Sequence, residues 1–167
     1  MNGIIEAAVQ LLQRQAVFHN VTIVRKFAAV PPVIVNPSQL QDAVTNLLVN
    51  AVDAMEAGGT LTVETASTTE PAEVLIRVAD TGCGIPEESM PYLFEPFFTT
   101  KRVGKGTGLG LAIVHGVVTR ARGRVQVQTS PAGTTFTLQF PAAPVESAGE
   151  HHAERVGAGT GQLAVGS

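Results

Sequence analysis

The sequence predicts an α/β fold in a single domain, because segments with helical spacing of apolar residues alternate with short β-branched runs. Helical spacing occurs over residues 2–14, 38–55 and 109–120. The strand-like runs fall at residues 20–24, 33–35, 60–66, 74–79, 125–129 and 134–140. A chain of 167 residues has room for one ordinary domain of roughly 100 to 150 residues and a short extension.

The N-terminal part predicts an amphipathic helix followed by the start of a sheet. Residues 2–14 place isoleucine, alanine, valine and leucine at helical spacing. Residues 20–24 and 33–35 are β-branched runs separated by Pro31-Pro32. We interpret these two runs as strands joined by a turn.

The central helix has the strongest signals for its ends. Asn36-Pro37-Ser38 supplies N-terminal cap chemistry, and apolar residues from Leu40 to Met55 mark one helix face. Gly58-Gly59 predicts where the helix stops. The alternating runs at 60–66 and 74–79 are then expected to pair as strands.

The C-terminal part predicts a helix, a hairpin and a tail. The helix covers residues 109–120, and Pro131-Ala132-Gly133 forms the tip of a hairpin between the last two strands. Residues 142–167 are rich in alanine and glycine and have no periodic apolar face. We therefore expect a domain at 1–141 and a disordered tail or linker at 142–167.

Composition excludes several classes of protein. Eleven lysines and arginines against fourteen acidic residues give a net charge of −3, which is unlike the basic surface of a nucleic-acid binder. The single cysteine cannot close an intrachain disulfide, so a reducing, cytoplasmic location is expected. No apolar run approaches the roughly 20 residues of a membrane helix, and residues 1–14 lack signal-peptide features. We expect no direct membrane contact from this chain.

Two glycine-rich segments predict phosphate binding. They are Asp80-Thr81-Gly82-Cys83-Gly84-Ile85-Pro86 and the run from Gly104 to Leu111. Glycine permits positive φ and a close approach of the backbone to a ligand, and amide groups at a helix start hold anions. The first segment lacks the last glycine of the dinucleotide-binding motif, and the second lacks the lysine and hydroxyl pair of a P-loop.

Together, four ordered motifs resemble the catalytic domains of histidine kinases over about residues 1–141. The N, G1, F and G2 boxes of that family match residues 46–54, 80–86, 94–101 and 106–110. The resemblance implies a Bergerat-type ATP-binding fold, an α+β two-layer sandwich with a mixed sheet and helices on one face. It also implies a nucleotide between two helices under a mobile lid at about residues 89–107.

The resemblance assigns roles to individual residues. Asn50 matches the Mg²⁺ ligand, and Asn46 lies one helical turn earlier on the same face. Asp80 matches the carboxylate that accepts a hydrogen bond from the adenine amino group. Gly82 and Gly84 are expected to make room for the purine. The apolar wall of this pocket is Ile85.

The cationic and hydrophobic partners of the nucleotide are expected in the lid and the G2 box. Lys101, Arg102 and Lys105 are candidates for neutralising the triphosphate, with Lys101 taken as catalytic. Many members of the family place a lysine or arginine where this sequence has Asp53, which shifts the cationic role to the lid. The remaining nucleotide-binding candidates are Asp53, Phe98, Gly106, Thr107, Gly108, Leu109, Gly110 and Thr135. Phe97 and Phe98 are expected either to anchor the lid or to pack in the core.

The resemblance and Asn46 together favour phosphoryl transfer over hydrolysis. Relatives that hydrolyse ATP carry a glutamate at the position of Asn46, and a neutral amide cannot take a proton from water. We therefore expect a protein histidine kinase domain that binds ATP and Mg²⁺. His19, His115 and His151-His152 lack the context of a phosphoacceptor, so the expected partners are a separate dimerisation and phosphoacceptor domain and a response regulator. A serine kinase of the anti-sigma type and a non-catalytic ATP-binding module remain as alternatives.

Overall fold

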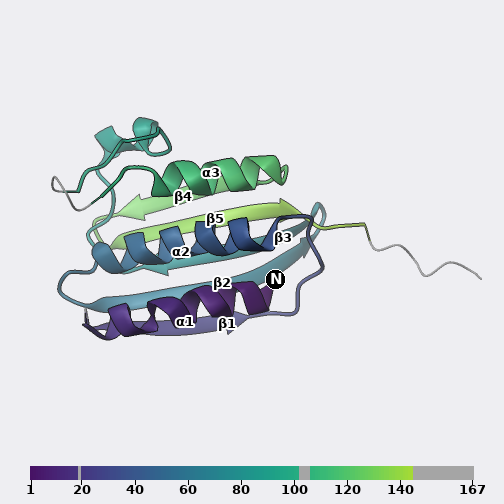
Figure 1. The fold of residues 1–167 in the computed structure, drawn as a ribbon, viewed down its shortest axis with the longest axis horizontal. Helices are drawn as coiled ribbons and strands as arrows, with labels where there is room; N and C mark the ends of the chain where they lie inside the picture. The colour runs from purple at the N-terminus through teal and green to yellow at the C-terminus, as the bar shows by residue number, and fades with distance from the viewer. Residues whose placement is uncertain (19, 102–105, 145–167) are drawn as a thin grey trace, which may run out of the picture.

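A mixed β-sheet with helices on one face organises the protein (Figure 1). The computed structural model describes residues 1–18, 20–101 and 106–144, and in these residues five strands follow the order β1-β2-β3-β5-β4. Strands β1 and β2 are parallel, and the other neighbouring strands are antiparallel. The strands are β1 (Val21–Phe27), β2 (Gly59–Thr69), β3 (Ala72–Asp80), β4 (Arg124–Ser130) and β5 (Gly133–Pro141). This arrangement confirms the predicted fold class.

The helical layer places α2 (Pro37–Asp53) between α1 (Asn2–Phe18) and α3 (Gly110–Arg120), as Figure 1 shows. A short 3₁₀ helix, η1 (Glu87–Tyr92), lies between β3 and α3 in the sequence. The predicted helices at both ends and the C-terminal hairpin are therefore confirmed, with small changes in their ends.

Helix α2 forms because its apolar residues repeat at helical spacing and its first turn is capped. The Asn36 side chain accepts a hydrogen bond from the backbone N–H of Gln39 at 3.1 Å, and Pro37 follows at the first helical position. The residues on the buried face are Leu40, Ala43, Val44, Leu47, Leu48, Ala51 and Val52. They meet the inward-facing side chains of the sheet, including Phe136 and Leu138 of β5.

Two expectations about secondary structure are wrong, one about a strand and one about the end of a helix. Residues 33–35 are not a strand: Val33 forms only an isolated bridge with Ala142, because Pro31 and Pro32 have no N–H to donate to a ladder. The other expectation concerns α2, which ends at Asp53 rather than Met55, although Met55 stays buried in the following turn.

The early end of α2 follows from the pairing of the next strand. Gly59 must lie opposite Val21 in the parallel ladder of β1 and β2, so the chain turns before it. Gly58 has φ +88°, and a Cβ there would lie 2.8 Å from the Asn20 carbonyl oxygen. Glycine is therefore required at this turn.

Backbone contacts with the rest of the protein continue for two residues beyond Pro141, the last residue of the predicted domain. The Ala142 N–H donates to the Ala72 carbonyl at 2.9 Å, and the Ala143 N–H donates to the Pro32 carbonyl at 2.8 Å. Most of the predicted tail, residues 145–167, lies outside the described residues.

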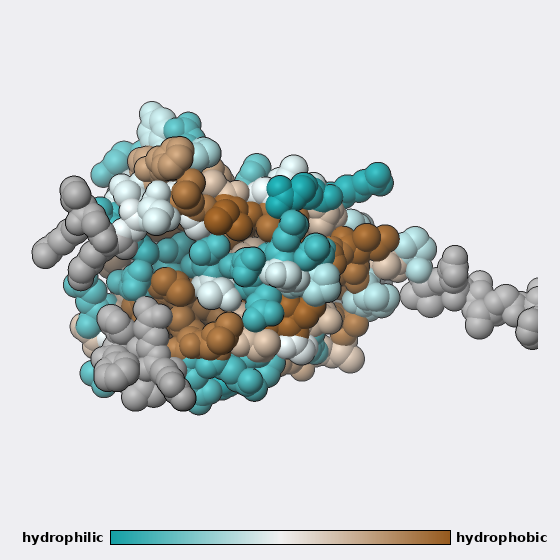
Figure 2. All heavy atoms as spheres, in the orientation of Figure 1, coloured by the Kyte–Doolittle hydropathy of each residue, from teal (hydrophilic) through white to brown (hydrophobic). Residues whose placement is uncertain are grey.

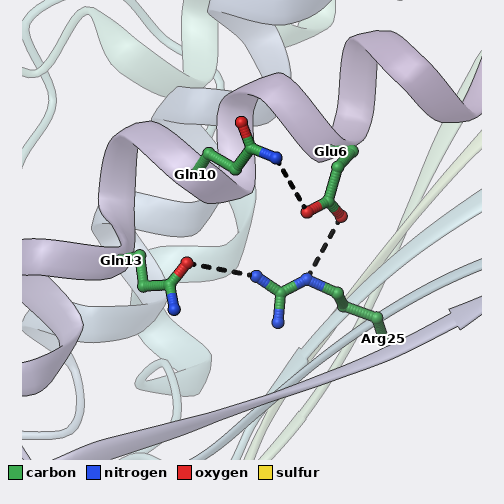
Figure 3. Close-up of polar contacts among 4 residues, drawn as sticks. All are labelled: Glu6, Gln10, Gln13 and Arg25. Atoms are coloured by element: carbon green, nitrogen blue, oxygen red, sulfur yellow. Dashed lines mark hydrogen bonds and ion pairs between the residues drawn. The ribbon is translucent and has the colours of Figure 1, made fainter.

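Polar contacts hold α1 against the edge strand β1 (Figure 3). The Arg25 Nε donates to Glu6 at 3.1 Å and the guanidinium also reaches Gln13 at 3.5 Å, while Gln10 donates to the same glutamate at 3.3 Å. Such partly exposed pairs contribute about 0.2–1 kcal/mol each, so they orient α1 while its buried apolar residues supply most of the stability.

The surface on the side of the helices is mixed in polarity (Figure 2). Apolar residues appear there in separate small groups between polar ones, a pattern that is ordinary for a protein surface. Within the described residues, no helix has the length and apolar character needed to cross a bilayer.

Removing the Leu48 side chain tests how much stability the buried face of α2 supplies. Leu48 is fully buried, so Leu48→Ala is expected to lower the free energy of unfolding by about 2–5 kcal/mol. Gln39→Ala, on the exposed side of the same helix, serves as the control and should change it by less than about 0.5 kcal/mol. Urea denaturation measures both, and equal effects of the two substitutions would contradict this account of the core.

Candidate nucleotide-binding site

The polar face of α2 carries three candidate residues in one row. Asn46, Asn50 and Asp53 are four and three positions apart, which places them on the same helix face. All three are partly buried, and they lie opposite the face that packs on the sheet. The buried face thus determines where this polar row points.

Lys101 reaches this row from the F box. Its Nζ donates to Asn50 Oδ1 at 2.9 Å and forms an ion pair with Asp53 Oδ2 at 2.6 Å. The predicted metal ligand, the predicted catalytic lysine and the atypical Asp53 are therefore brought together. An amide oxygen and a carboxylate that already accept a cation are the kind of donors that Mg²⁺ takes. Among the described residues no cluster of three or more histidine, cysteine or acidic side chains forms a metal site. The candidate ligands, Asn50 and Asp53, are chosen for their oxygen donors and their shared contact with Lys101.

Asp80 ends β3 with its carboxylate largely buried. Its Oδ1 accepts hydrogen bonds from the backbone N–H groups of Gly82 at 2.9 Å and Thr134 at 3.2 Å. Burial raises the pKa of the Asp80 carboxyl above its ordinary value, and the two hydrogen bonds partly oppose this rise. No described group donates to Oδ2, and no described side-chain oxygen is both fully buried and unpartnered. The second oxygen is thus open to a ligand.

The neighbour of Asp80 on β5 is Thr134, and not the nucleotide-binding candidate Thr135. Successive strand residues point to opposite faces, and Thr134 shares the buried, helix-facing side of the sheet with Asp80. Thr135 therefore faces the other side of the sheet, away from Asp80. The register of β5 against β3 determines which threonine lies opposite Asp80. The sequence Thr134-Thr135 does not reveal that register. Thr134 also pairs with Thr129 at 3.1 Å between the hydroxyl oxygens.

The G1 turn is packed against two neighbouring backbone segments. A Cβ on Gly82 would lie 2.6 Å from the Ala54 carbonyl oxygen, and the Cys83 N–H donates to that same carbonyl at 3.2 Å. Gly84 has φ +76°, and a Cβ there would overlap the Ser130 carbonyl. The space beside both α-carbons is filled by backbone, so these glycines are required by packing rather than to leave room for a purine. Ile85 is partly buried against the core.

The G2 box leads into α3 directly beside the polar row of α2. A Cβ on Gly110, the first residue of α3, would lie 3.3 Å from Asn46 Oδ1. Gly108 has φ +66°, and its carbonyl accepts a hydrogen bond from the Phe97 N–H at 2.9 Å. Thr107 accepts a hydrogen bond from the Leu109 N–H at 3.3 Å, while Gly106 is exposed. The candidates that lie outside the described residues are Arg102, Lys105, His19 and His151-His152.

Aromatic contacts attach the F box to its surroundings. Phe98 is partly buried and packs on Tyr92, with the ring centroids 5.7 Å apart. Phe94 packs on His115 of α3 at 5.2 Å. Phe97 is 76% exposed, so it is not a core residue. Neither pairing follows a regular spacing, so the sequence does not predict Tyr92 and Phe94 as aromatic partners.

A cavity of about 460 Å³ adjoins this site at the end of α2. It is lined by residues 53–58 and 81–83, so it shares Asp53 and Gly82 with the candidate site. The exposed thiol of Cys83 lies on its wall. Asn50 and Asp80 are not among its lining residues, so these two groups lie outside the cavity.

The arrangement of these boxes agrees with a known family. The model of that family, described as "Histidine kinase-, DNA gyrase B-, and HSP90-like ATPase", matches residues 35–144. The chain belongs to this family.

Named relatives are bacterial sensor kinases. The chain is 40% identical over 124 residues to sensor kinase CckA of Brucella abortus, which covers 66% of this chain and 13% of that protein. It is 37% identical over 145 residues to sensor histidine kinase ZraS of Escherichia coli, covering 84% of this chain and 30% of the relative. The solved structure of the mycobacterial sensor histidine kinase MprB superposes with a TM-score of 0.75 at 29% identity, covering 86% and 97% of the two chains. The chain thus spans less than a third of the length of either curated relative.

Replacing Asp80 by asparagine tests the cost of its buried charge. Burial raises the pKa of Asp80, so its ionised form destabilises the fold above that pKa, and the cost disappears as the pH falls below the unfolded value of 3.8. The amide oxygen introduced by the substitution can accept both backbone hydrogen bonds without carrying the charge. Asp80→Asn is therefore expected to raise the free energy of unfolding at neutral pH by about 0.5–2 kcal/mol.

Urea denaturation without nucleotide, at pH 7.5 and at pH 4, measures this effect. The gain should shrink at the lower pH, where wild-type Asp80 becomes protonated. Asp42→Asn, an exposed acid on α2, is the matched control and should leave the stability difference between the two pH values unchanged. A loss of stability in Asp80→Asn at neutral pH would contradict the assignment.

Proposed function

We propose that this chain is the ATP-binding catalytic domain of a histidine kinase, which transfers the γ-phosphate of ATP to a histidine on a separate domain. The observation that carries the proposal is Asp80, which has one oxygen held by two backbone N–H groups and a second oxygen to which no described group donates. Membership of an ATPase family and similarity to sensor kinases support it.

The base is recognised at Asp80. An ionised carboxylate accepts hydrogen bonds only, so Oδ2 suits the amino group of adenine and not a carbonyl oxygen at the same place. Two backbone donors fix the carboxylate from the other side, which orients it before the ligand arrives. Ile85 and Leu109, both partly buried, supply apolar surface on neighbouring segments.

The phosphates are held between α2 and the start of α3. Gly110 brings the N-terminus of α3 against Asn46, so backbone amides and the positive end of the helix dipole meet the polar row. Asn50 and Asp53 are the residues that would hold Mg²⁺, which when bound neutralises phosphate charge. Lys101 adds a cation from the F box.

The polar row of α2 also favours phosphoryl transfer over ATP hydrolysis. The amide of Asn46 lies one turn before Asn50, where a general base for water would be needed, and an amide does not accept the proton. The protein then contributes positioning and charge neutralisation. A neutral imidazole nitrogen of the partner attacks the γ-phosphorus, and the bond between that phosphorus and the β–γ bridging oxygen breaks to release ADP. His115 is exposed but packs on Phe94, and Gly116 rather than an acid follows it. The partners proposed are a phosphoacceptor domain and a response regulator, in the cytoplasm.

Phosphotransfer to a separate domain tests this function. The chain should transfer label from radiolabelled ATP to its cognate histidine phosphoacceptor domain, expressed separately. The phosphate on that domain should be acid-labile and base-stable. Asn50→Ala should lower the rate at least about 100-fold, because metal stabilisation of phosphoryl charge is worth several kcal/mol. Asp42→Asn should retain the wild-type rate.

The other outcomes would each contradict the proposal. Acid-stable label on the partner indicates a serine kinase, and bound ATP without any transfer indicates a non-catalytic module. Rapid phosphate release by the chain alone indicates a hydrolase. Fast labelling of the chain's own histidines would contradict the assignment of the acceptor to a separate domain.

A further inference from the structure

The ammonium of Lys101 lies on the very oxygen that the proposed site offers to a metal. We propose that Asp53 is a positioning residue that holds Lys101 on Asn50 in the nucleotide-free protein, so that Lys101 and Mg²⁺ compete for Asn50. The competition for Asn50 rests on the proposed function, in which Asn50 binds Mg²⁺. The pairing of Asp53 with Lys101 stands on the structure alone.

The geometry identifies Asp53 as the anchor. Its Oδ2 lies 2.6 Å from Lys101 Nζ, closer than Asn50 Oδ1 at 2.9 Å, and it carries the full negative charge. Both members of the ion pair have side chains that are 31% exposed, so the pair is shielded on part of its surface. The amide of Asn50 alone provides only a dipole, so the charge of Asp53 determines where the ammonium is held.

This ion pair differs from the others that the structure describes. Arg25–Glu6 joins α1 to β1, while Arg77–Glu64 and Arg124–Glu73 each join two strands of the sheet. Only Lys101–Asp53, among the described pairs, joins the F box to the polar row of α2. A ligand that binds Asn50 or Asp53 must displace Lys101, whereas no candidate site residue takes part in the other three pairs.

Two cations cannot use the same oxygen of Asn50. Mg²⁺ binds oxygen at about 2.0–2.1 Å and keeps a tight octahedral shell, so an ammonium on the same atom has to leave. Asp53 also carries the same sign of charge as a triphosphate, and its charge is compensated in the free protein by Lys101. When metal-free ATP binds, Lys101 can reach its phosphates only by leaving Asp53, and the uncompensated charge of Asp53 then repels the triphosphate. If Asn50 and Asp53 held Mg²⁺, the charge of Asp53 would be compensated without Lys101, and the lysine would be free to reach the phosphates.

Amine labelling of the nucleotide-free chain tests the pairing directly. An acylating reagent should modify Lys101 more slowly than Lys26, an exposed lysine of β1 that serves as the internal reference. In Asp53→Asn the rate at Lys101 relative to Lys26 should rise by about threefold, the size expected for a partly exposed ion pair. Asp42→Asn should leave the ratio unchanged. No rise in Asp53→Asn would overturn the pairing.

The metal dependence of ATP affinity tests the competition. Calorimetry gives the ratio of the ATP Kd in EDTA to the Kd in excess Mg²⁺. Asp53→Asn removes the charge that repels metal-free ATP and frees Lys101, so the Kd in EDTA should itself fall by about threefold, and the ratio with it. Loss of a metal ligand alone would raise the Kd in Mg²⁺ and leave the Kd in EDTA unchanged. Lys101→Met removes the cation that metal-free ATP needs, so the ratio should rise.

Opposite shifts in the two variants separate positioning from a structural role. If Asp53 only stabilised the fold, both Kd values would weaken together and the ratio would match that of Asp42→Asn, which would overturn the proposal. A wild-type chain that binds no ATP under either condition would refute the proposed function and the competition for Asn50. The labelling result would still decide the pairing of Asp53 with Lys101.

Discussion

The burial of one face of α2 against the sheet is the constraint on which the rest of the molecule depends. Seven apolar residues of this helix are buried. Burial of the larger side chains among them stabilises the fold by roughly 1.5–3 kcal/mol each. Turning the helix by one residue would expose part of this face and bury the amides of Asn46 and Asn50 without partners, at a cost of about 1–3 kcal/mol each. Core packing therefore sets the direction of the polar row.

Three backbone contacts bring the remaining parts of the site to that row. The turn after β3 bonds to the carbonyl of Ala54 at the end of α2, the start of α3 lies against Asn46, and the carbonyl of Gly108 holds the F box through Phe97. Glycines at these places allow the close approaches. The site is thus assembled largely by backbone packing. The side chains of Asn50 and Asp53 are not used in that packing and bond to Lys101 instead.

The same contacts explain why the protein carries a buried acid. Asp80 is held at the end of β3 by two backbone donors in a position where burial disfavours its charge. A fold optimised for stability alone has no need of an ionised group there. The stability given up at Asp80 is the expected cost of a preorganised acceptor for a ligand.

The sequence predicted much of this, and the failures have physical causes. Helical periodicity located α2, and the ordered boxes located Asn50 and Asp80. Residues 33–35 have strand-forming side chains, but Pro31 and Pro32 before them cannot donate to a ladder, so only the isolated bridge of Val33 forms. Tertiary contacts account for the other failures. Thr134 rather than Thr135 meets Asp80 because of strand register, and the space at Gly82 is taken by the backbone of a different element. The pairing of Lys101 with Asp53 spans 48 positions through an irregular segment, so no spacing rule predicts it.

The most direct test of the central claim, that the second carboxylate oxygen of Asp80 recognises adenine, is a comparison of ATP with purine riboside triphosphate, which lacks the amino group. Calorimetry in Mg²⁺ should show wild-type protein binding ATP about 10- to 100-fold more tightly, because a hydrogen bond to a charged acceptor is worth about 1.5–3 kcal/mol. In Asp80→Asn this preference should be lost. Equal affinity of the wild-type protein for the two nucleotides would contradict the account.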